Sequence, residues 1–187
     1  MPSGKTRGGR LWLGTHEQGL ISSERGVITT YNVKDGLPDN VVWALHKARD
    51  GSMWVGTFAG LALIKNGKVS TVLANDGRLV GWVRSHYEDS HGTLWVASSA
   101  GLLRWDGSGL NRFTRLDGLS DSSVRSVFVD REDNLWIGTN AAGGLDRWRK
   151  SNVVAYTAKQ GLSNDGARAI YQDHQGERLG CHRFQPV

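Results

Sequence analysis

The sequence predicts an all-β fold made of repeated four-stranded sheets, and three observations support this prediction. A tryptophan-centred phrase recurs four times, with indoles at Trp12, Trp54, Trp95 and Trp136. These tryptophans are 42, 41 and 41 residues apart. A second phrase, Asp-Gly-Leu or a close variant, keeps nearly the same period at residues 35–37, 76–79, 117–119 and 160–162. The chain also holds 25 glycines, a number typical of folds with many tight turns. Two phrases with one period indicate a repeated structural unit.

One repeat contains four short segments that read as strands. Three of them are apolar or β-branched, and the fourth alternates polar and apolar residues. The predicted strands are residues 41–47, 52–57, 61–65 and 68–73. Asn66-Gly67 between the last two is a strong hairpin signal, because both residues tolerate positive φ. Four antiparallel strands in about 41 residues are typical of one blade of a β-propeller.

We therefore expect about four propeller blades, because no segment has the apolar spacing of paired helices. We expect residues 1–10 and 177–187 to be irregular. The predicted units are a partial blade at 11–34, whole blades at 35–75, 76–116 and 117–159, and the first strand of a partial blade at 160–176.

The two ends of the array leave its closure open. The first blade is expected to begin at its second strand, 11–15, while residues 167–173 resemble a first strand. The C-terminal strand could then complete the N-terminal blade, which would give a strand-exchanged four-bladed ring. The favoured alternative is a partial propeller, an open arc whose uncovered flanks promote self-association. Two copies could also pair into an eight-bladed ring.

Each repeat Trp is predicted to fill the wedge between adjacent blades, because stacking buries faces that one sheet leaves exposed. The glycines beside it, such as Gly56 and Gly60, are expected where only a small residue lets the chain turn.

Charge and composition exclude several classes of protein. Lys and Arg number 23 and Asp and Glu 18, and no basic run would follow a phosphate backbone, so we expect no nucleic-acid partner. Cys181 is the single cysteine and can form no internal disulfide. No segment has the length of a signal-peptide core or a membrane span, so the chain as written reads as cytoplasmic.

Candidate ligand-binding residues lie at the mouth, the face that carries the loop before the first strand of each blade and the loop between its second and third strands. Trp43, Arg84, Arg125 and Arg168 occupy one register position in successive repeats. Guanidinium groups at one height could bind a carboxylate, sulfate or phosphate. Asn40, Phe58 and Trp82 complete the candidate set, the aromatic pair as a platform for a sugar ring. The alternative role for all of them is packing between blades.

Catalytic and metal-binding patterns are absent from the sequence, and we expect no cofactor. The six histidines (16, 46, 86, 91, 174 and 182) lack metal-ligand spacing. Asp50, Asp89, Asp130 and Asp173 recur before turns, which explains them without catalysis. The only carboxylates expected at the mouth are turn residues such as Asp39 and Asp121.

The segments 35–61 (DGLPDNVVWALHKARDGSMWVGTFAGL) and 117–145 (DGLSDSSVRSVFVDREDNLWIGTNAAGGL) resemble the two-component regulator propeller repeat. The resemblance covers roughly residues 10–176 and implies a periplasmic sensor region that precedes a membrane span and a histidine kinase or diguanylate cyclase. In that family the propeller detects carbohydrate fragments and has no catalysis of its own. The chain has fewer repeats than the usual seven-bladed rings and no kinase sequence, so it reads as a truncated copy.

The resemblance leads to one functional hypothesis and two alternatives. The hypothesis is a sensor module, or a fragment of one, that binds a small polar ligand such as an oligosaccharide and signals through an output partner. The alternatives are a carbohydrate-active enzyme on a propeller scaffold and a protein-interaction platform.

Overall fold

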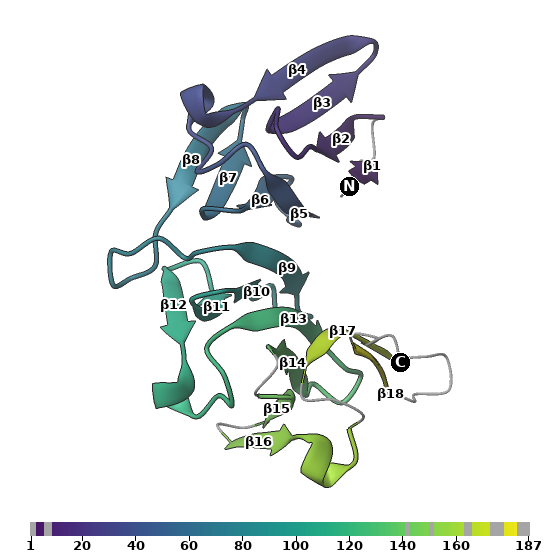
Figure 1. Cartoon of the computed structure of the whole chain (residues 1–187). Coiled ribbons are helices and arrows are strands. Elements are labelled where there is room, and N and C mark those ends of the chain that lie inside the picture. The colour runs from purple at the N-terminus through teal and green to yellow at the C-terminus, as the bar shows by residue number, and fades with distance from the viewer. Residues whose placement is uncertain are drawn as a thin grey trace.

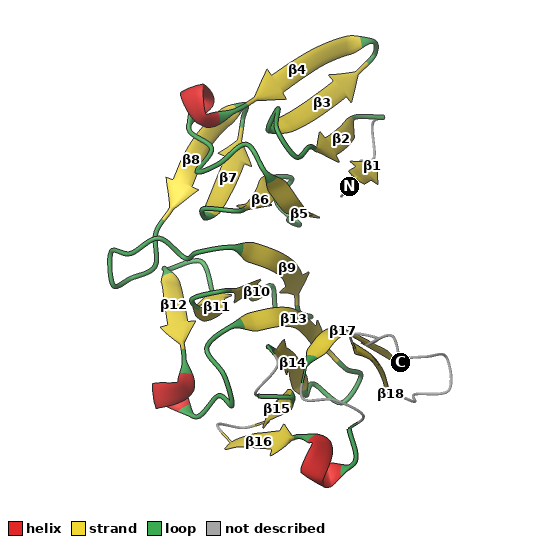
Figure 2. Ribbon diagram, viewed as in Figure 1, coloured by secondary structure: helices red, strands yellow, loops and turns green. Residues whose placement is uncertain are grey.

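The computed structural model describes residues 3–5, 9–140, 143–149, 152–162, 166–172 and 178–182. These residues form β-strands and three short 3-10 helices, η1 (Val33–Asp35), η2 (Arg115–Asp117) and η3 (Ala158–Gln160) (Figure 2). In this described part, every helix is too short and too polar to cross a bilayer. The predicted all-β fold is confirmed.

The described strands form four sheets of four antiparallel strands, which we call blades 1 to 4. Blade 1 consists of β1 (Ser3–Lys5), β2 (Leu11–Gly14), β3 (Leu20–Glu24) and β4 (Val27–Tyr31). Blade 2 consists of β5 (Val42–Lys47), β6 (Met53–Thr57), β7 (Leu61–Lys65) and β8 (Lys68–Val72). Blade 3 consists of β9 (Val83–Glu88), β10 (Leu94–Ser98), β11 (Gly101–Trp105) and β12 (Leu110–Phe113). Blade 4 consists of β13 (Val124–Val129), β14 (Leu135–Thr139), β15 (Leu145–Arg149) and β16 (Asn152–Tyr156). A last sheet pairs β17 (Ala167–Gln172) with β18 (Arg178–His182).

The predicted strands of blade 2 agree with β5 to β8 to within one residue at each end. The β7–β8 hairpin turns at Asn66 and Gly67, with φ of 53° and 75°. A turn of this kind needs positive φ at both central residues, which Asn-Gly adopts at low cost. The strand pattern read from one repeat therefore describes the blade.

Two strands lie where the sequence predicts irregular ends, so these predictions are wrong. β1 pairs with β2, with Gly4 opposite Trp12, and supplies the first strand that blade 1 was expected to lack. β18 pairs with β17 and lies in the predicted C-terminal tail. The three residues of β1 include no apolar side chain, so backbone pairing forms a strand that hydrophobic alternation cannot reveal.

The blades follow one another in an open arc (Figure 1). The inner strands β5, β9, β13 and β17 contact one another in succession, while β4, β8, β12 and β16 lie at the outer ends of their blades. The strand-exchanged ring does not form, because β1 occupies the position beside β2 and β17 pairs with β18 instead. The partial propeller of about four blades is the architecture that the structure shows.

The hydrophobic core lies between blades. Trp12 shares a cluster with Val42, Met53 and Val55 of blade 2. Trp54 shares one with Val83 and Leu94 of blade 3 in the same way.

The third interface, between blades 3 and 4, follows the same rule, since Trp95 packs against Val127 and Leu135 of blade 4. Trp12, Trp54 and Trp136 are buried and Trp95 is half-buried. Removing one such buried aromatic side chain costs about 3–5 kcal/mol. The repeated indoles therefore join successive blades.

The role predicted for Gly56 is wrong. Gly56 lies inside β6 rather than at a turn, and a Cβ there would meet Val83 Cγ1 of the next blade at 2.5 Å. A Cβ on Gly138 in β14 would likewise lie only 2.7 Å from the carbonyl oxygen of Ala167. Both glycines allow the inner strand of the following blade to approach.

Three of the four copies of the Asp-Gly-Leu phrase, at residues 35–37, 117–119 and 160–162, lie at the 3-10 turns that lead into the inner strands, whereas the copy at 76–79 forms no 3-10 helix. In η2 the Thr114 side chain accepts from the backbone N–H of Leu116, and Asp117 accepts from the backbone N–H of Thr114. Gly118 follows with φ of 99°, which favours glycine. Asn32 with Asp35, and Thr157 with Gln160, repeat this capping box.

The recurring aspartates before the second strands build turns, as predicted, and two of them also hold an indole. Asp89 accepts from Trp95 Nε1 at 3.0 Å, and Asp130 accepts from Trp136 Nε1 at 2.7 Å. Asp50 accepts instead from Ser52 and from Lys65. Asp173 lies outside the described residues.

Candidate ligand site at the mouth

Backbone hydrogen bonds bring the mouth loops together. The N–H of Phe58 donates to the carbonyl of Val41 at 3.0 Å, and the N–H of Ser99 donates to the carbonyl of Trp82 at 2.9 Å. Each bond ties the loop after a second strand to the start of an inner strand. The prediction that these two loops share one face is confirmed.

Four of the side chains singled out in the sequence line one pocket at this face. Trp43 of β5, Arg84 of β9 and Arg125 of β13 are each the second residue of an inner strand, and Trp82 directly precedes β9. The pocket has a volume of about 480 Å³. This volume lies within the range of small-molecule sites.

An aromatic stack forms one side of the mouth. The Phe58 and Trp82 rings lie 4.4 Å apart between centroids, with 26° between their planes. The Arg84 guanidinium lies over the Trp82 ring at 5.4 Å from its centroid, a cation–π arrangement. Phe58 and Trp82 are 39% and 43% exposed, so this stack is open to solvent.

The second arginine is held in place by a neighbouring loop. Arg125 donates from Nε and Nη2 to the side-chain oxygen of Asn140, at 2.9 and 2.6 Å. A guanidinium fixed on one edge has fewer conformations to lose when it binds an oxyanion. Arg84 and Arg125 together give the pocket two positive charges.

Two predicted residues contribute differently. The Asn40 side-chain oxygen accepts from the backbone N–H of Val33 at 3.1 Å, so this amide helps to build the loop before β5. Arg168 holds the same register position on β17, but its side chain lies outside the described residues.

Sequence reasoning missed two residues that support the site. His16 meets Trp43 edge-on at 5.6 Å between ring centroids, and Asn140 holds Arg125. One register position, four residues after the repeat Trp of each blade, is occupied by His16, Phe58, Ser99 and Asn140. This shared position in the repeat is the sequence signal that could have identified His16 and Asn140.

The acidic side chains of the mouth loops have structural partners. Asp39 accepts from the backbone N–H of Val41 at 2.7 Å, and Asp121 accepts from that of Ser123 at 2.8 Å.

Asp146 of β15 is fully buried, at the position that Ala62 and Leu103 occupy in blades 2 and 3. Burial raises the pKa of Asp146, although Ser120 donates to it from its backbone and side chain. Among the described residues, His, Cys, Asp and Glu form no group of three or more that could hold a metal ion.

Comparison with known proteins gives one family and several solved structures. A family model described as two component regulator propeller matches residues 36–59 and 118–141. A comparison with curated proteins gave no match.

The extracellular domain of BT3049 from B. thetaiotaomicron, described as a hybrid two component system, is 21% identical, with a TM-score of 0.81. The match covers 96% of this chain and 26% of that one. The extracellular domain of BT4673 from the same organism is 20% identical over 91% of this chain and 25% of that one, with a TM-score of 0.72. Virginiamycin B lyase from Staphylococcus aureus is 17% identical over 95% of this chain and 61% of that one, also with a TM-score of 0.72. The chain thus spans about a quarter of the two extracellular domains, and these likenesses show the propeller fold.

Proposed function

We propose that this chain, an array of two-component regulator propeller repeats, is a ligand-sensing module that binds a small polar ligand at its mouth. One observation carries the proposal: Trp43, Trp82, Arg84 and Arg125, from three successive blades, line a single pocket. A ligand in this pocket would contact several blades at once. Binding could therefore change how the blades sit against one another and signal to an output partner.

The chemistry of the pocket favours an oligosaccharide that carries a carboxylate or sulfate. The guanidinium groups of Arg84 and Arg125 can donate paired hydrogen bonds to an oxyanion. The exposed Phe58–Trp82 stack offers a flat apolar surface to the C–H face of a sugar ring.

The proposal includes an extracytoplasmic location and no catalysis. The location is favoured by the two structural neighbours that are extracellular domains. The structural partners of Asp39 and Asp121 favour binding over an acid–base reaction. Some propellers of similar fold, such as virginiamycin B lyase, are named as enzymes, so the experiment must also measure turnover.

The experiment is a glycan-array screen, followed by calorimetric titration of the selected oligosaccharide. We expect Arg84→Ala and Arg125→Ala each to weaken binding about tenfold or more, because each removes a charged donor. Arg104→Ala is the matched control, since Arg104 lies on β11 outside the pocket and pairs with Asp106. Turnover of a labelled oligosaccharide that Asp39→Asn or Asp121→Asn abolishes would overturn the proposal in favour of an enzyme.

A further inference from the structure

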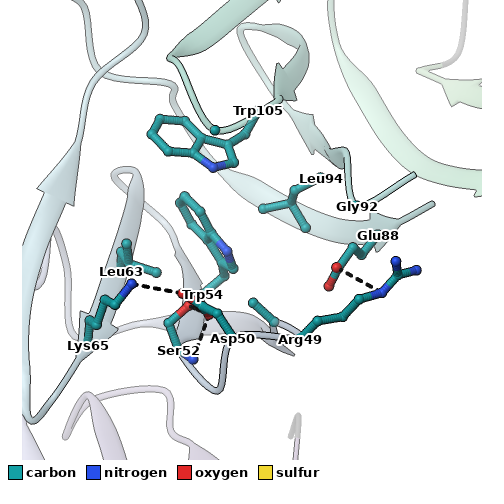
Figure 3. Close-up of a pocket in the computed structure, with 12 residues that line it drawn as sticks. Arg49, Asp50, Ser52, Trp54, Leu63, Lys65, Glu88, Gly92, Leu94 and Trp105 are labelled. Atoms are coloured by element: carbon teal, nitrogen blue, oxygen red, sulfur yellow. Dashed lines mark hydrogen bonds and ion pairs between the residues drawn. The ribbon is translucent and has the colours of Figure 1, made fainter. Parts of the chain in front are cut away.

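A second pocket lies in the wedge between blades 2 and 3 (Figure 3). The turns beside it are at the strand ends opposite to the mouth loops. The pocket has a volume of about 430 Å³ and is reached past the turns that follow β5, β9 and β11. Trp54 and Trp105 form its walls, with ring centroids 5.5 Å apart and planes at 63°. Leu63 and Leu94 extend the apolar lining. We call it the wedge pocket.

Two local differences distinguish this wedge from the one between blades 3 and 4. Between blades 3 and 4, Phe113 packs edge-on against Trp148 with centroids 4.7 Å apart. The residue in the register of Phe113 in blade 2 is the smaller Val72. The residue directly after the inner strand, six positions before the repeat Trp, also differs: it is Asp89 in blade 3 and Asp130 in blade 4, but the smaller Ala48 in blade 2.

Ala48 has no carboxylate, so the indole of Trp54 lacks the acceptor that the next two blades provide. Asp89 and Asp130 accept from the indole N–H groups of Trp95 and Trp136. In the part of the chain that the structure describes, Trp54 Nε1 has no such acceptor, because Ala48 occupies the equivalent position and Asp50 accepts from Ser52 and Lys65. Figure 3 shows the Trp54 nitrogen on the side of Arg49 and Glu88. The wedge pocket thus offers a hydrogen-bond donor at its wall.

The rim of the wedge pocket carries two positively charged and two negatively charged side chains. Lys65 Nζ lies 2.9 Å from Asp50 Oδ2 on one side, and Arg49 Nε lies 3.2 Å from Glu88 Oε1 on the other (Figure 3). Hydrogen bonds from Ser52 and Lys65 lower the pKa of Asp50 to about 2, so its carboxylate is ionised at neutral pH. Two cations and two anions around an apolar floor favour a neutral ligand with many hydroxyl groups, since carboxylates accept from hydroxyls while Arg and Lys donate to them.

We propose that the wedge pocket binds a neutral saccharide of one or two rings. The C–H face of a pyranose lies against Trp105 and against the small accessible edge of the largely buried Trp54. Its hydroxyls meet the indole N–H of Trp54 and the two ion pairs at the rim. The inference is independent of the mouth, whose paired arginines favour an anion.

The test follows the indole resonance of Trp54 in ¹⁵N-labelled protein, assigned with Trp54→Phe. Cellobiose, maltose and methyl α-mannoside are titrated to about 10 mM, the millimolar affinity range of small neutral ligands. We expect at least one of them to shift the Trp54 resonance saturably. Val72→Phe copies the residue that fills the next wedge, and Trp105→Ala removes one wall, so each should weaken binding about tenfold or more.

The controls separate the two sites. Trp148→Phe, in the next wedge, should leave the saccharide affinity unchanged, and so should Arg84→Ala at the mouth. The proposal is overturned if no saccharide moves the Trp54 resonance, or if binding survives both Val72→Phe and Trp105→Ala. It is also overturned if a tryptophan-containing dipeptide shifts that resonance while the saccharides do not, because the pocket would then be a peptide site.

Discussion

At the scale of single residues, His86 couples the blade 2–blade 3 interface to pH. Its Nε2 is enclosed and, among the described residues, has no hydrogen-bond partner. Burial, with a smaller effect from the nearby His46, lowers the pKa of His86 to about 3. The titratable groups around it are His46, whose ring centroid is 6.5 Å away, and Glu88, which lies 2.8 Å from His46 and 3.2 Å from Arg49.

We predict that the free energy of unfolding falls as the pH drops below about 6.5, the pKa of histidine in unfolded chains. As the pH falls below about 6.5, this histidine takes up a proton in the unfolded state, whereas folded His86 stays neutral down to about pH 3, so stability is lost through that window. Between pH 7 and 5 the loss from this residue should be about 1–2 kcal/mol, measured by urea unfolding.

The matched variants for this measurement are His86→Gln and His91→Gln. His86→Gln removes the titrating group and should flatten the pH dependence between pH 7 and 5. His91 is exposed, so His91→Gln should leave that dependence as in the wild type. Equal pH slopes for His86→Gln and the wild type would contradict the assignment.

At the scale of elements, the strand pattern was predictable because each blade repeats short apolar, β-branched or alternating segments with turn residues between them. The reason for Gly56 could not be predicted. Its neighbour, Val83, lies in another blade 27 residues ahead, and only the packed sheets bring them together. β1 was missed for a related reason, since backbone pairing with β2 forms it.

We predict that Gly56→Val destabilises the chain by about 1–3 kcal/mol or more, because the new side chain overlaps Val83 and pushes β9 away from β6. Ser70→Ala is the control for the unfolding measurement, since Ser70 is exposed on β8 and should change stability by no more than about 0.5 kcal/mol. A Gly56→Val protein as stable as Ser70→Ala would show that the two blades do not approach as described.

In the candidate site, too, some features could be predicted from the sequence of one repeat, and others arise only from packing between elements. The register of Trp43, Arg84 and Arg125 was visible in the sequence, because inner strands present equivalent residues at one height. The stacking of Phe58 on Trp82 and the hydrogen bond from Arg125 to Asn140 could not be predicted. Each is a tertiary contact between a loop and the start of an inner strand. The loop-building role of Asn40 likewise depends on its contact with Val33.

At the scale of the whole molecule, the arc leaves one blade face uncovered. Leu11 and Leu13 on β2 are 44% and 37% exposed, whereas Met53 and Val55 in the same register of blade 2 are 4% and 0% exposed. Ile28, across β3 from Leu11, adds to this apolar surface. In the following blades, the equivalent face packs against the preceding blade. An apolar face of this kind favours self-association when it is exposed to solvent.

We predict concentration-dependent self-association through this face. Light scattering at rising concentration should give a mass above the 20.5 kDa of one chain. Leu11→Lys with Leu13→Lys should restore the monomer mass, because the added charges oppose burial. Leu116→Lys, at a residue 98% exposed on η2, is the control and should associate like the wild type. A monomer mass for the unmodified chain at all concentrations would contradict this prediction.

The central claim is that successive blades present their mouth residues to one ligand. The most direct test is the dissociation constant of the array-selected oligosaccharide for the wild type and for the double variant Arg84→Ala with Arg125→Ala. The account predicts that affinity falls by about a hundredfold or more in the folded double variant, while Arg104→Ala binds like the wild type. Unchanged affinity in the double variant would show that the ligand binds elsewhere.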